Sequence, residues 1–451
     1  MALDATKTPA ALPLTGQPSG LSTLFFAEMW ERFSYYGMRA ILVLFMVAPT
    51  AQGGLGFTTK DAASLYGTYT MAVYMLSVVG GLAADRFLGA SRAVLIGGAI
   101  IAGGHFSMAV HSLPFFYGGL SLIALGTGLL KPNISTMVGS LYAPGDPRRD
   151  SGFSLFYMGI NMGAIMAPLV CGWLAESSTF KDLLAARGFD PTRSWHWAFA
   201  TAGVGMLIGL AVFSSKRRQL PSSGPKEGSS PMTAPSLTTG EWRRVVAIGI
   251  LFAFTIMFWS AYEQKGASLN LFAKQLVSRN LFGWEFPASW LQSLTPFFVI
   301  VLAPLFAQLW IRLGDRQPSG SRKFALGLIA IGIGALLLVP ASALTAQGGV
   351  SPLWLVGFYF FAVVGELCVS PVGLSMVTRL SPPQIVGVMM GAWFFATSLG
   401  NKLAGYFSGF FTATDPEALM RLYGGIAVML FAGAVVLAVA APRIEQMAVE
   451  R

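Results

Sequence analysis

The stretch FFAEMWERFSYYGMRAILVLFM, residues 25–46, decides how this chain folds. It places two glutamates and two arginines in a segment that otherwise suits the hydrocarbon core of a membrane. A charged side chain at membrane depth costs about 2.5–3.5 kcal/mol even on a lenient insertion scale, so a helix keeps it only where it faces protein. At about 100° per residue, one narrow stripe of the helix holds the side chains of Glu28, Glu31, Arg32, Tyr35 and Arg39. This stripe predicts a membrane helix whose charged face lies against other helices and serves a function there.

The composition indicates the class of protein. Only 11% of the 451 residues are charged, 54% are hydrophobic and the mean hydropathy is +0.62. Soluble domains contain about 25% charged residues, so we expect an integral membrane protein and not a very apolar soluble enzyme. A pI near 9.7 would suggest nucleic-acid binding in a soluble protein. In a membrane protein, basic residues gathered in cytoplasmic loops can also raise the pI.

Cysteine and histidine give no sign of a disulfide framework or a metal site. The two cysteines, Cys171 and Cys368, lie far apart in separate apolar segments. The histidines show no ligand spacing, so no metal or other cofactor is expected: they are His105, His111 and His196. The first twenty residues lack the apolar core of a signal peptide, so we expect a cytoplasmic tail over 1–20 and an uncleaved first span.

Apolar segments long enough to cross a membrane, about 20 residues each, recur along the chain. Twelve candidates lie at 21–48, 61–84, 91–111, 114–141, 150–175, 195–214, 243–273, 286–313, 322–345, 351–380, 384–411 and 417–441. The Ser/Pro/Gly-rich segment 215–242 is typical of a flexible cytoplasmic linker. We therefore expect an N-terminal six-helix bundle over 21–214, a C-terminal six-helix bundle over 243–441 and a cytoplasmic tail over 442–451.

The basic residues orient the spans. With a cytoplasmic N-terminus, 18 of the 30 lysines and arginines fall on the cytoplasmic side, 7 on the opposite side and 5 inside spans. This bias follows the positive-inside rule and places both termini in the cytoplasm. It also explains the high pI without a nucleic-acid partner. The expected location is the plasma (inner) membrane, with multiple spans in the lipid bilayer.

An internal repeat supports the division into two halves. The segment GGLAADRFLGASR (80–92) follows the second span, and LWIRLGDRQPSGSRK (309–323) follows the eighth. Both place an Asp-Arg pair at an expected cytoplasmic turn, with further cations after it. For the second copy alone, an ordinary charged turn is an equal alternative. Two such halves with a substrate site between them are the plan of the major facilitator fold, an all-α membrane architecture of twelve transmembrane helices in two six-helix bundles.

Charged residues inside the spans come from both predicted halves. The acids are Glu28, Glu31, Glu263 and Glu366, and the bases are Arg32, Arg39 and Lys131. They could form static ion pairs that lock helices together. We favour a shared cavity at the interface, because buried carboxylates beside cations can exchange protons as the pairs form and break. Two further lysines are assigned to the periphery, Lys265 near the outer end of its span and Lys402 at a helix contact or snorkelling to the surface.

Three motifs resemble one known family. Glu28-x-x-Glu31-Arg32-Phe33-x-Tyr35-Tyr36-Gly37 is similar to the ExxERFxYYG signature of the proton-dependent oligopeptide transporters, the POT or PTR family of the major facilitator superfamily. The segment GGLAADRFLG (80–89) resembles the family's motif between spans two and three. The segment FYMGINMG (156–163) resembles its FYxGINxG motif on span five. The resemblance runs from span one to span eleven.

The resemblance implies residues that bind a peptide. Arg39 and Lys131 would hold the peptide carboxylate, and Glu366 would hold the amino group. Other polar and aromatic residues would contact the peptide or shape its pockets: Tyr35, Tyr36, Tyr74, Asn161, Trp259 and Trp393. A zwitterionic peptide needs a cationic and an anionic end in one cavity, and this set supplies both.

The resemblance also implies residues that couple transport to protons. Glu28, Glu31 and Arg32 would couple proton to substrate, and Glu263 would pair with Lys131 or a neighbouring arginine in a gate. The chain departs from the family pattern in several places. The segment 215–242 is too short for the two extra helices of many bacterial members. The sequence Gln-Ser-Leu-Thr-Pro (292–296) replaces QSxNP, Tyr262 replaces a glutamate of some relatives, and span two lacks the histidine of animal members.

The predicted function is proton-coupled symport of di- and tripeptides by alternating access, with protons as the coupling ion and a monomer as the functional unit. One alternative keeps the fold and changes the solute to nitrate, an amino-acid derivative or a peptide-like drug. A second alternative is a nutrient sensor that does not transport, although few residues follow the last span to form a signalling domain. An enzyme is not expected, because no metal set, nucleophile–base pair or phosphate loop stands out.

Overall fold

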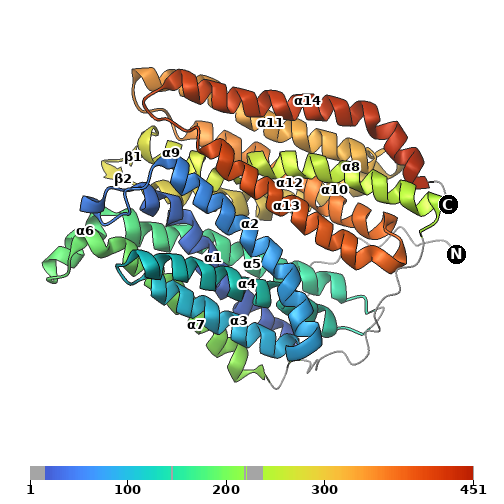
Figure 1. Cartoon of the computed structure of the whole chain (residues 1–451), viewed down its shortest axis with the longest axis horizontal. Coiled ribbons are helices and arrows are strands. Elements are labelled where there is room, and N and C mark those ends of the chain that lie inside the picture. The colour runs from blue at the N-terminus through green and yellow to red at the C-terminus, as the bar shows by residue number, and fades with distance from the viewer. Residues whose placement is uncertain (1–15, 144–145, 218–219, 221–236, 450–451) are drawn as a thin grey trace.

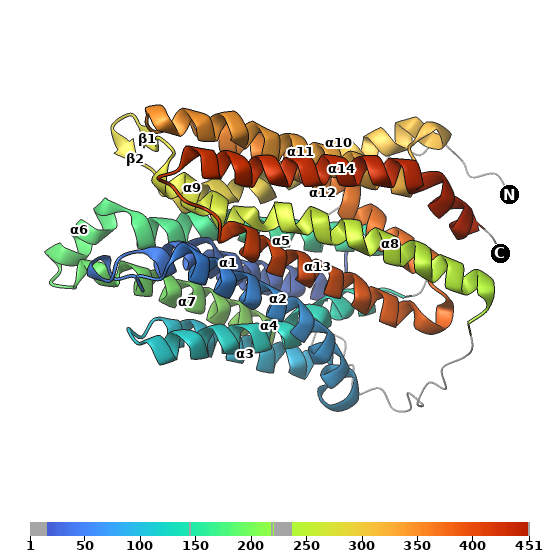
Figure 2. The ribbon, with the colours of Figure 1, turned by 45° about the horizontal axis from the view of Figure 1, so that its top comes forward.

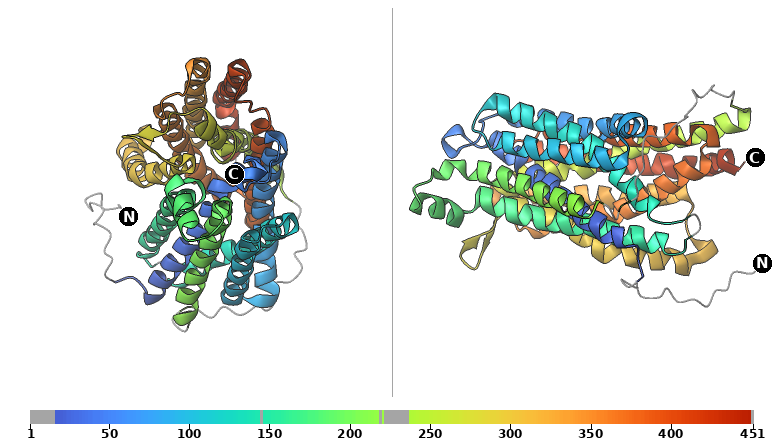
Figure 3. Two further views of the ribbon diagram at one scale, coloured as in Figure 1. Left: turned by 90° about the vertical axis from the view of Figure 1, so that its left-hand side faces the viewer. Right: turned by 90° about the horizontal axis from the view of Figure 1, so that it is seen from below.

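The computed structural model describes residues 16–143, 146–217, 220 and 237–449, and its long helices run side by side (Figure 1). Helices α1 to α7, blue to green, form the lower part of Figure 1, and helices α8 to α14, yellow to red, form the upper part. The end-on view in Figure 3 shows the same two groups. We call α1–α7 the N-terminal group and α8–α14 the C-terminal group. The predicted tail over 1–15, most of the linker (218–219 and 221–236) and residues 450–451 lie outside the described residues.

The N-terminal group consists of long helices joined by short connections. Its α-helices are α1 (Ser19–Val47), α2 (Thr59–Ala83), α3 (Ala90–Met108), α4 (Leu113–Ser140), α5 (Arg149–Glu176), α6 (Ser178–Ala186) and α7 (Ser194–Ser215). Its short helical turns are η1 (Thr50–Gln52), η2 (Ala84–Leu88) and η3 (Pro191–Arg193). The predicted Asp-Arg turn after α2 is thus a π-helical continuation of that helix, which ends at Gly89 with a φ of 73°. The short helix α6 was not predicted.

The C-terminal group contains the remaining helices and one small hairpin. Its α-helices are α8 (Thr239–Tyr262), α9 (Ser268–Gln275), α10 (Leu294–Leu313), α11 (Gly320–Leu344), α12 (Leu353–Leu380), α13 (Val386–Ser408) and α14 (Pro416–Val449). Its helical turns are η5 (Glu263–Gly266), η6 (Ala288–Ser293), η7 (Gly314–Arg316), η8 (Thr345–Gln347) and η9 (Pro383–Ile385). Strands β1 (Asn280–Leu281) and β2 (Trp284–Glu285) pair antiparallel, with Asn280 opposite Glu285.

The helices have the length and composition of membrane spans. Within the described residues, nine helical segments are long and apolar enough to cross a membrane. Helix α1 falls outside these limits, as do α3 and α13, and α1 carries Glu28, Glu31, Arg32 and Arg39. The chain is therefore an integral membrane protein with charge concentrated in one buried helix.

The seventh predicted span differs from the expected continuous helix over 243–273. Helix α8 ends at Tyr262, the turn η5 follows, and α9 begins at Ser268. The break fits closely against α2: a Cβ atom on Gly266 would lie 1.7 Å from the hydroxyl oxygen of Tyr66. The polar run Glu-Gln-Lys-Gly at 263–266 marks the break in the sequence, but the predicted span was drawn through it. Helix α14 also extends beyond the predicted limit at 441, to Val449.

The two ends of the molecule differ. Helix α6 and the β1–β2 hairpin lie at the left end of Figures 1 and 2, which we call the hairpin end. The start of α1 lies at the opposite end, where Arg148 at the start of α5 donates to the Gly16 carbonyl at 2.7 Å. In this exposed connection, hydrogen bonds from the side chain and backbone of Arg148 lower the pKa of Asp146. Helices α2 and α13 join the groups toward the hairpin end, where a Cβ on Gly67 would lie 3.0 Å from the Cα of Gly405.

Candidate functional site

A cavity of about 150 Å³ lies between the N-terminal and C-terminal groups. Helices α1 and α5 form one wall, and α8, η5, η6, α10 and α12 form the other. The residues that line it are Tyr36, Arg39, Tyr157, Ile160, Asn161, Ala164, Pro168, Tyr262, Lys265, Gln292, Thr295, Pro296, Val299 and Glu366. The cavity thus combines cations, a carboxylate, phenol hydroxyls and amides with an apolar remainder, which is the composition of a site for a small charged solute.

Arg39 and Glu263 form a buried ion pair that joins the two groups. Arg39 from α1 donates to the carboxylate of Glu263 in η5, and their side chains are only 7% and 4% exposed. The Nε atom of Arg39 donates to the hydroxyl of Tyr66 at 2.7 Å. Of the partners considered for Glu263, the structure thus selects an arginine, Arg39. The pair is a direct charge link across the interface.

Glu366 is held by Tyr262 on the C-terminal side of the cavity. The Tyr262 hydroxyl donates to the Glu366 carboxylate, and the Lys265 ammonium lies 3.5 Å from the centre of the Tyr262 ring. The expected peripheral position of Lys265 is therefore wrong, because the helix breaks after Tyr262 and the turn η5 points Lys265 into the cavity. Tyr262 stands where some relatives have a glutamate, and in this chain its hydroxyl is the hydrogen-bond partner of Glu366.

Glu28, Glu31 and Arg32 form a second buried cluster within α1. The Nε atom of Arg32 lies 3.0 Å from a carboxylate oxygen of Glu28, and Arg32 also pairs with Glu31. All three are at most 4% exposed. Among the described residues, both oxygens of Glu31 and one oxygen of Glu28 have no hydrogen-bond partner, and Arg32 is the ion-pair partner of both carboxylates. Two carboxylates therefore share one guanidinium.

Lys131 lies near this cluster and outside the cavity lining. Its ammonium is 4.1 Å from the centre of the Tyr74 ring, and it interacts electrostatically with both Glu28 and Glu31. Helix α4 continues through Pro132, the residue after Lys131. Lys131 is thus placed with the glutamates of α1, and Tyr74 interacts electrostatically with Lys131 and with Glu366.

The other predicted residues fall into two groups. Tyr36 and Asn161 line the cavity, and Asn161 donates to the Tyr157 carbonyl at 2.9 Å. Tyr35 is buried behind them, packed edge-on against Tyr36 with ring centres 5.3 Å apart. Its ring lies between two guanidinium groups, 5.6 Å from that of Arg32 and 5.9 Å from that of Arg39.

The two predicted tryptophans do not line the cavity. Trp393 is buried in the core of the C-terminal group, with ring centres 6.2 Å from Phe252 and 6.3 Å from Phe324. Trp259 packs 4.9 Å from the ring of Tyr262, one layer behind the cavity wall. A large aromatic ring contributes most to stability when its apolar surface is buried against neighbouring helices. Both tryptophans therefore pack against other aromatic residues of the C-terminal group.

Several residues of the site, in the cavity lining or in contact with it, were not predicted. Tyr157 and Gln292 stood inside quoted motifs, so the motifs themselves were the available signal. Tyr66 had none, because it meets Arg39 only through the packing of α2 against α1. In the part of the chain that the structure describes, no group of three or more His, Cys, Asp and Glu side chains is placed to hold a metal ion.

The interface is closed toward the hairpin end by hydrogen bonds between α5 and η6. Ser293 donates to the Ile165 carbonyl at 2.8 Å, and the Trp290 indole donates to the Leu169 carbonyl at 2.9 Å. Glu176, the last residue of α5, adds further hydrogen bonds between α5 and η6. In addition, α9 and η6 contact α1, since Asn270 and Gln292 both donate to the Ala40 carbonyl.

Glu176 receives four donors from the C-terminal group. Its carboxylate accepts from the Ser289 backbone N–H at 3.1 Å and hydroxyl at 2.7 Å, the Ala288 N–H at 3.3 Å and the Lys274 ammonium at 3.1 Å. The Glu176 side chain is 1% exposed. Close packing assists this contact, because a Cβ on Gly172 would lie 2.1 Å from the Ser289 hydroxyl. No motif in the sequence marked Glu176.

A charged cavity between two groups of apolar helices is typical of a membrane protein that handles a small polar solute. The sequence profile described as the POT family matches residues 91–239 and 236–424, and the chain belongs to this family. The fold is accordingly the major facilitator fold, and the resemblance read from the three motifs is confirmed.

Named relatives cover almost the whole chain. The peptide transporter YePEPT of Yersinia enterocolitica subsp. palearctica serotype O:3 (strain YE-P4) is 37% identical over 503 residues, covering 96% of each chain. The di-/tripeptide transporter of Lactococcus lactis subsp. cremoris is 34% identical over 499 residues, covering 96% of this chain and 97% of the relative. A crystal structure of a mutant of the peptide transporter POT in complex with alafosfalin matches with a TM-score of 0.89 at 36% identity, covering 97% of each chain.

Proposed function

We propose that this protein is a proton-coupled symporter that imports di- and tripeptides by alternating access. The observation that carries the proposal is the cavity between the helix groups, which presents Arg39 and Lys265 together with Glu366. Its relatives are named as transporters of peptides, and these residues offer a complementary charge for each end of a peptide.

The two charged ends of a bound peptide would replace side chains that now pair with Arg39 and Glu366. A guanidinium binds a carboxylate through two parallel hydrogen bonds, so the peptide carboxylate competes with Glu263 for Arg39. The peptide ammonium competes with the Tyr262 hydroxyl for Glu366. The present volume of about 150 Å³ is below the range of roughly 300–1,000 Å³ that ligand pockets usually have. The helix groups must therefore move apart to admit a tripeptide.

The exchange at Arg39 supplies a reason for proton coupling. When a peptide carboxylate takes Arg39, the buried Glu263 loses its cation. An unpaired buried charge costs several kcal/mol, so Glu263 is neutralised most readily by taking a proton. The Glu28–Glu31–Arg32 cluster, which has two acids for one guanidinium, is a second proton acceptor in the same helix as Arg39. Lys131 would tune this cluster and would not itself bind the peptide.

The structure is closed toward the hairpin end, which we place on the outer side of the plasma membrane with both termini in the cytoplasm. The positive-inside bias of the basic residues supports this orientation. Loading from outside would then require the α5–η6 hydrogen bonds to open while the opposite end closes. One chain supplies every lining residue of the cavity, so we propose that a monomer is the functional unit.

The test is uptake of labelled dialanine and trialanine into proteoliposomes with and without an imposed pH gradient. With no membrane potential imposed, we expect accumulation only when the outside is acidic, and loss of accumulation on adding a protonophore. Binding of peptide without uptake under any gradient would favour the sensor alternative and overturn the proposal. Competition by nitrate, free alanine and a peptide-like drug separates the alternative solutes, since a peptide carrier should be blocked far better by unlabelled dialanine than by nitrate.

The role of Glu366 can be tested separately. An N-acetylated dipeptide lacks the ammonium that Glu366 would hold, so the wild-type protein should strongly prefer the free dipeptide. The E366Q variant should lose most of this preference. A Y406F variant is the matched control, because Tyr406 is exposed on α13 outside the cavity lining. Equal preference in E366Q and the wild type would exclude Glu366 as the amino-group partner.

A further inference from the structure

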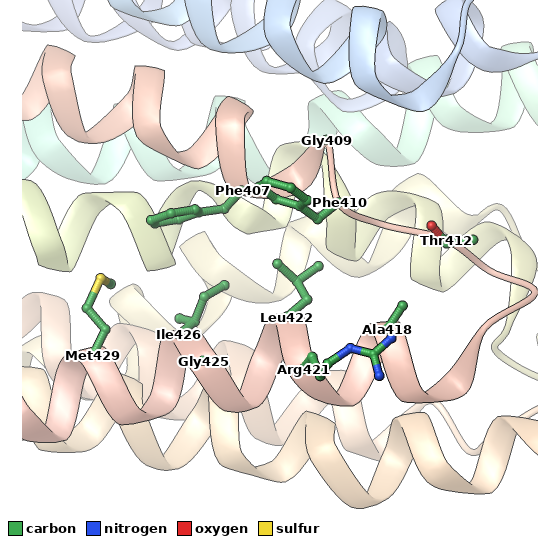
Figure 4. Close-up of a pocket in the computed structure, with 10 residues that line it drawn as sticks. All are labelled: Phe407, Gly409, Phe410, Thr412, Ala418, Arg421, Leu422, Gly425, Ile426 and Met429. Carbon is green, nitrogen blue, oxygen red and sulfur yellow. The ribbon is translucent and has the colours of Figure 1, made fainter.

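A second cavity, of about 660 Å³, lies between the end of α13 and the start of α14 (Figure 4). It shares no lining residue with the cavity between the helix groups. Figure 4 shows Phe407 and Phe410 from the α13 side across from Leu422 and Ile426 of α14. The complete lining is Phe407, Gly409, Phe410, Thr412, Ala418, Arg421, Leu422, Gly425, Ile426 and Met429. We call this cavity the α13–α14 groove.

Arg421 lines one end of the groove, and two carboxylates next to the lining pair with it. Arg421 lies 3.6 Å from the Asp415 carboxylate and 3.3 Å from the Glu417 carboxylate. All three side chains are exposed: 67% for Arg421, 46% for Asp415 and 84% for Glu417. Exposed ion pairs of this kind contribute little to stability. Their groups therefore remain free to bind a partner that offers an anion and a cation at once.

The groove has the dimensions and position of a lipid chain. Helix α14 belongs to a membrane-spanning segment, and its charged start lies at the hairpin end. From Arg421 to Met429 the helix rises about 12 Å, which compares with about 15 Å for one leaflet of a 30 Å hydrocarbon core. The groove is therefore apolar at the depth of acyl chains and charged at the level of headgroups.

We propose that the α13–α14 groove binds a phospholipid whose headgroup carries a primary ammonium, a phosphatidylethanolamine. Arg421 would donate to the phosphate, and Asp415 and Glu417 would accept from the ammonium. A phosphatidylglycerol headgroup offers no cation to the two carboxylates. A phosphatidylcholine headgroup has a cation but no N–H donor. Charge complementarity thus selects the ethanolamine class.

The position of the lipid gives it a route to the transport cycle. Phe407 of the groove lies on α13, the helix that packs against α2 of the N-terminal group through Gly405 and Gly67. On the same helix, Lys402 donates to Thr68 of α2 at 2.6 Å. A lipid in the groove would therefore contact α13 close to where this helix meets α2. This consequence rests on the proposed function, whereas lipid binding itself does not.

The test is native mass spectrometry of the purified, delipidated chain titrated with phosphatidylethanolamine, phosphatidylcholine or phosphatidylglycerol of identical acyl chains. Hydrogen bonds to charged groups contribute about 1.5–3 kcal/mol, so the wild type should bind the ethanolamine lipid about tenfold or more tightly than either other lipid. R421Q should lose this preference. G425L should lose binding to this site altogether, because a Cβ on Gly425 enters open space in the groove and a leucine would occupy it.

The matched control is G249L on α8. Gly249 is also an exposed helical glycine whose Cβ would meet open space, and it lies outside the groove. G249L should bind lipid as the wild type does. Equal binding of the three lipids by the wild type, or equal behaviour of G425L and G249L, would overturn the proposal. A disulfide-linked dimer of a G425C variant would also overturn it, because a second copy of the chain would then cover the groove. The readout does not use transport, so this proposal and the proposed function fail separately.

Discussion

Glu176 is the residue whose substitution tests the closure of the hairpin end most directly. Its buried carboxylate accepts from two donors of Ser289, from the Ala288 N–H and from the Lys274 ammonium. In E176Q, the amide oxygen can still accept from Ser289. The new NH2 group, however, faces two donors and can accept from neither.

The cost of this change follows from the lost contacts. A hydrogen bond to a charged group contributes about 1.5–3 kcal/mol. The Lys274 ammonium adds little, since its side chain is 37% exposed. The loss of charge at the Ser289 and Ala288 donors should therefore destabilise the closed state by about 1.5–3 kcal/mol. At about 1.4 kcal/mol for each factor of ten, the equilibrium should shift about 10- to 100-fold toward the state open at the hairpin end.

The assay measures access to the cavity from the outer side. A T295C reporter, placed in a C171S/C368S background, lines the cavity and is buried in the present state. A membrane-impermeant maleimide added to intact cells should label this reporter at least about tenfold faster when E176Q is present.

The matched control for E176Q is E285Q. Glu285 pairs with Arg279 at the same end of the molecule, and both residues lie in the C-terminal group. E285Q should therefore leave labelling unchanged. If E176Q and E285Q label at the same rate, the α5–η6 contacts do not hold the hairpin end closed.

Three further predictions concern proton coupling and packing. E28Q or E31Q should abolish gradient-driven accumulation yet retain exchange of internal for external peptide, and uphill accumulation in both variants would exclude these residues as coupling groups. E263Q should lower accumulation at least about tenfold, because Arg39 then lacks its anionic partner in the empty carrier. Peptide transport by this variant is measured by counterflow. Accumulation at the wild-type level would contradict the exchange of Glu263 for the peptide carboxylate at Arg39. G37A should lower the melting temperature by several degrees, since its Cβ would lie 2.6 Å from the Cys171 sulfur. Adding C171A should restore the melting temperature. A G37A variant as stable as the wild type would show that α1 and α5 can move apart at this contact at no cost.

The sequence predicted the charged stripe of α1 because two constraints agree there. The cost of charge in a membrane and the helical period both require Glu28, Arg32 and Arg39 to face protein. The positions of the long helices followed from apolar length alone. Their partners did not, because pairing depends on packing between helices far apart in sequence. Tyr66 reaches Arg39 only through the α1–α2 contact, and no local pattern encodes that distance.

The break inside the seventh predicted span was missed, although the sequence carried a signal for it. The turn η5 has the polar sequence Glu-Gln-Lys-Gly, and it moves Lys265 from an expected peripheral position into the cavity. Trp393, predicted to shape a peptide pocket, lies in the core of the C-terminal group. An aromatic residue on an interface helix can either line a pocket or pack in the core, and the sequence alone does not distinguish the two. In the structure, the Trp393 ring packs against Phe252 and Phe324.

The balance of buried charge leads from the site to the energetics of transport. Four acids in the interface helices, Glu28, Glu31, Glu263 and Glu366, face four bases, Arg32, Arg39, Lys131 and Lys265. With all eight ionised, this set is neutral, and a zwitterionic peptide leaves it neutral. Each coupled proton then carries one net positive charge across the membrane, which is worth about 2.3 kcal/mol per 100 mV. An inside-negative potential should therefore drive uptake of a neutral dipeptide even without a pH gradient. Uptake that is indifferent to a potassium-diffusion potential of about 100 mV would show that another charge moves in compensation.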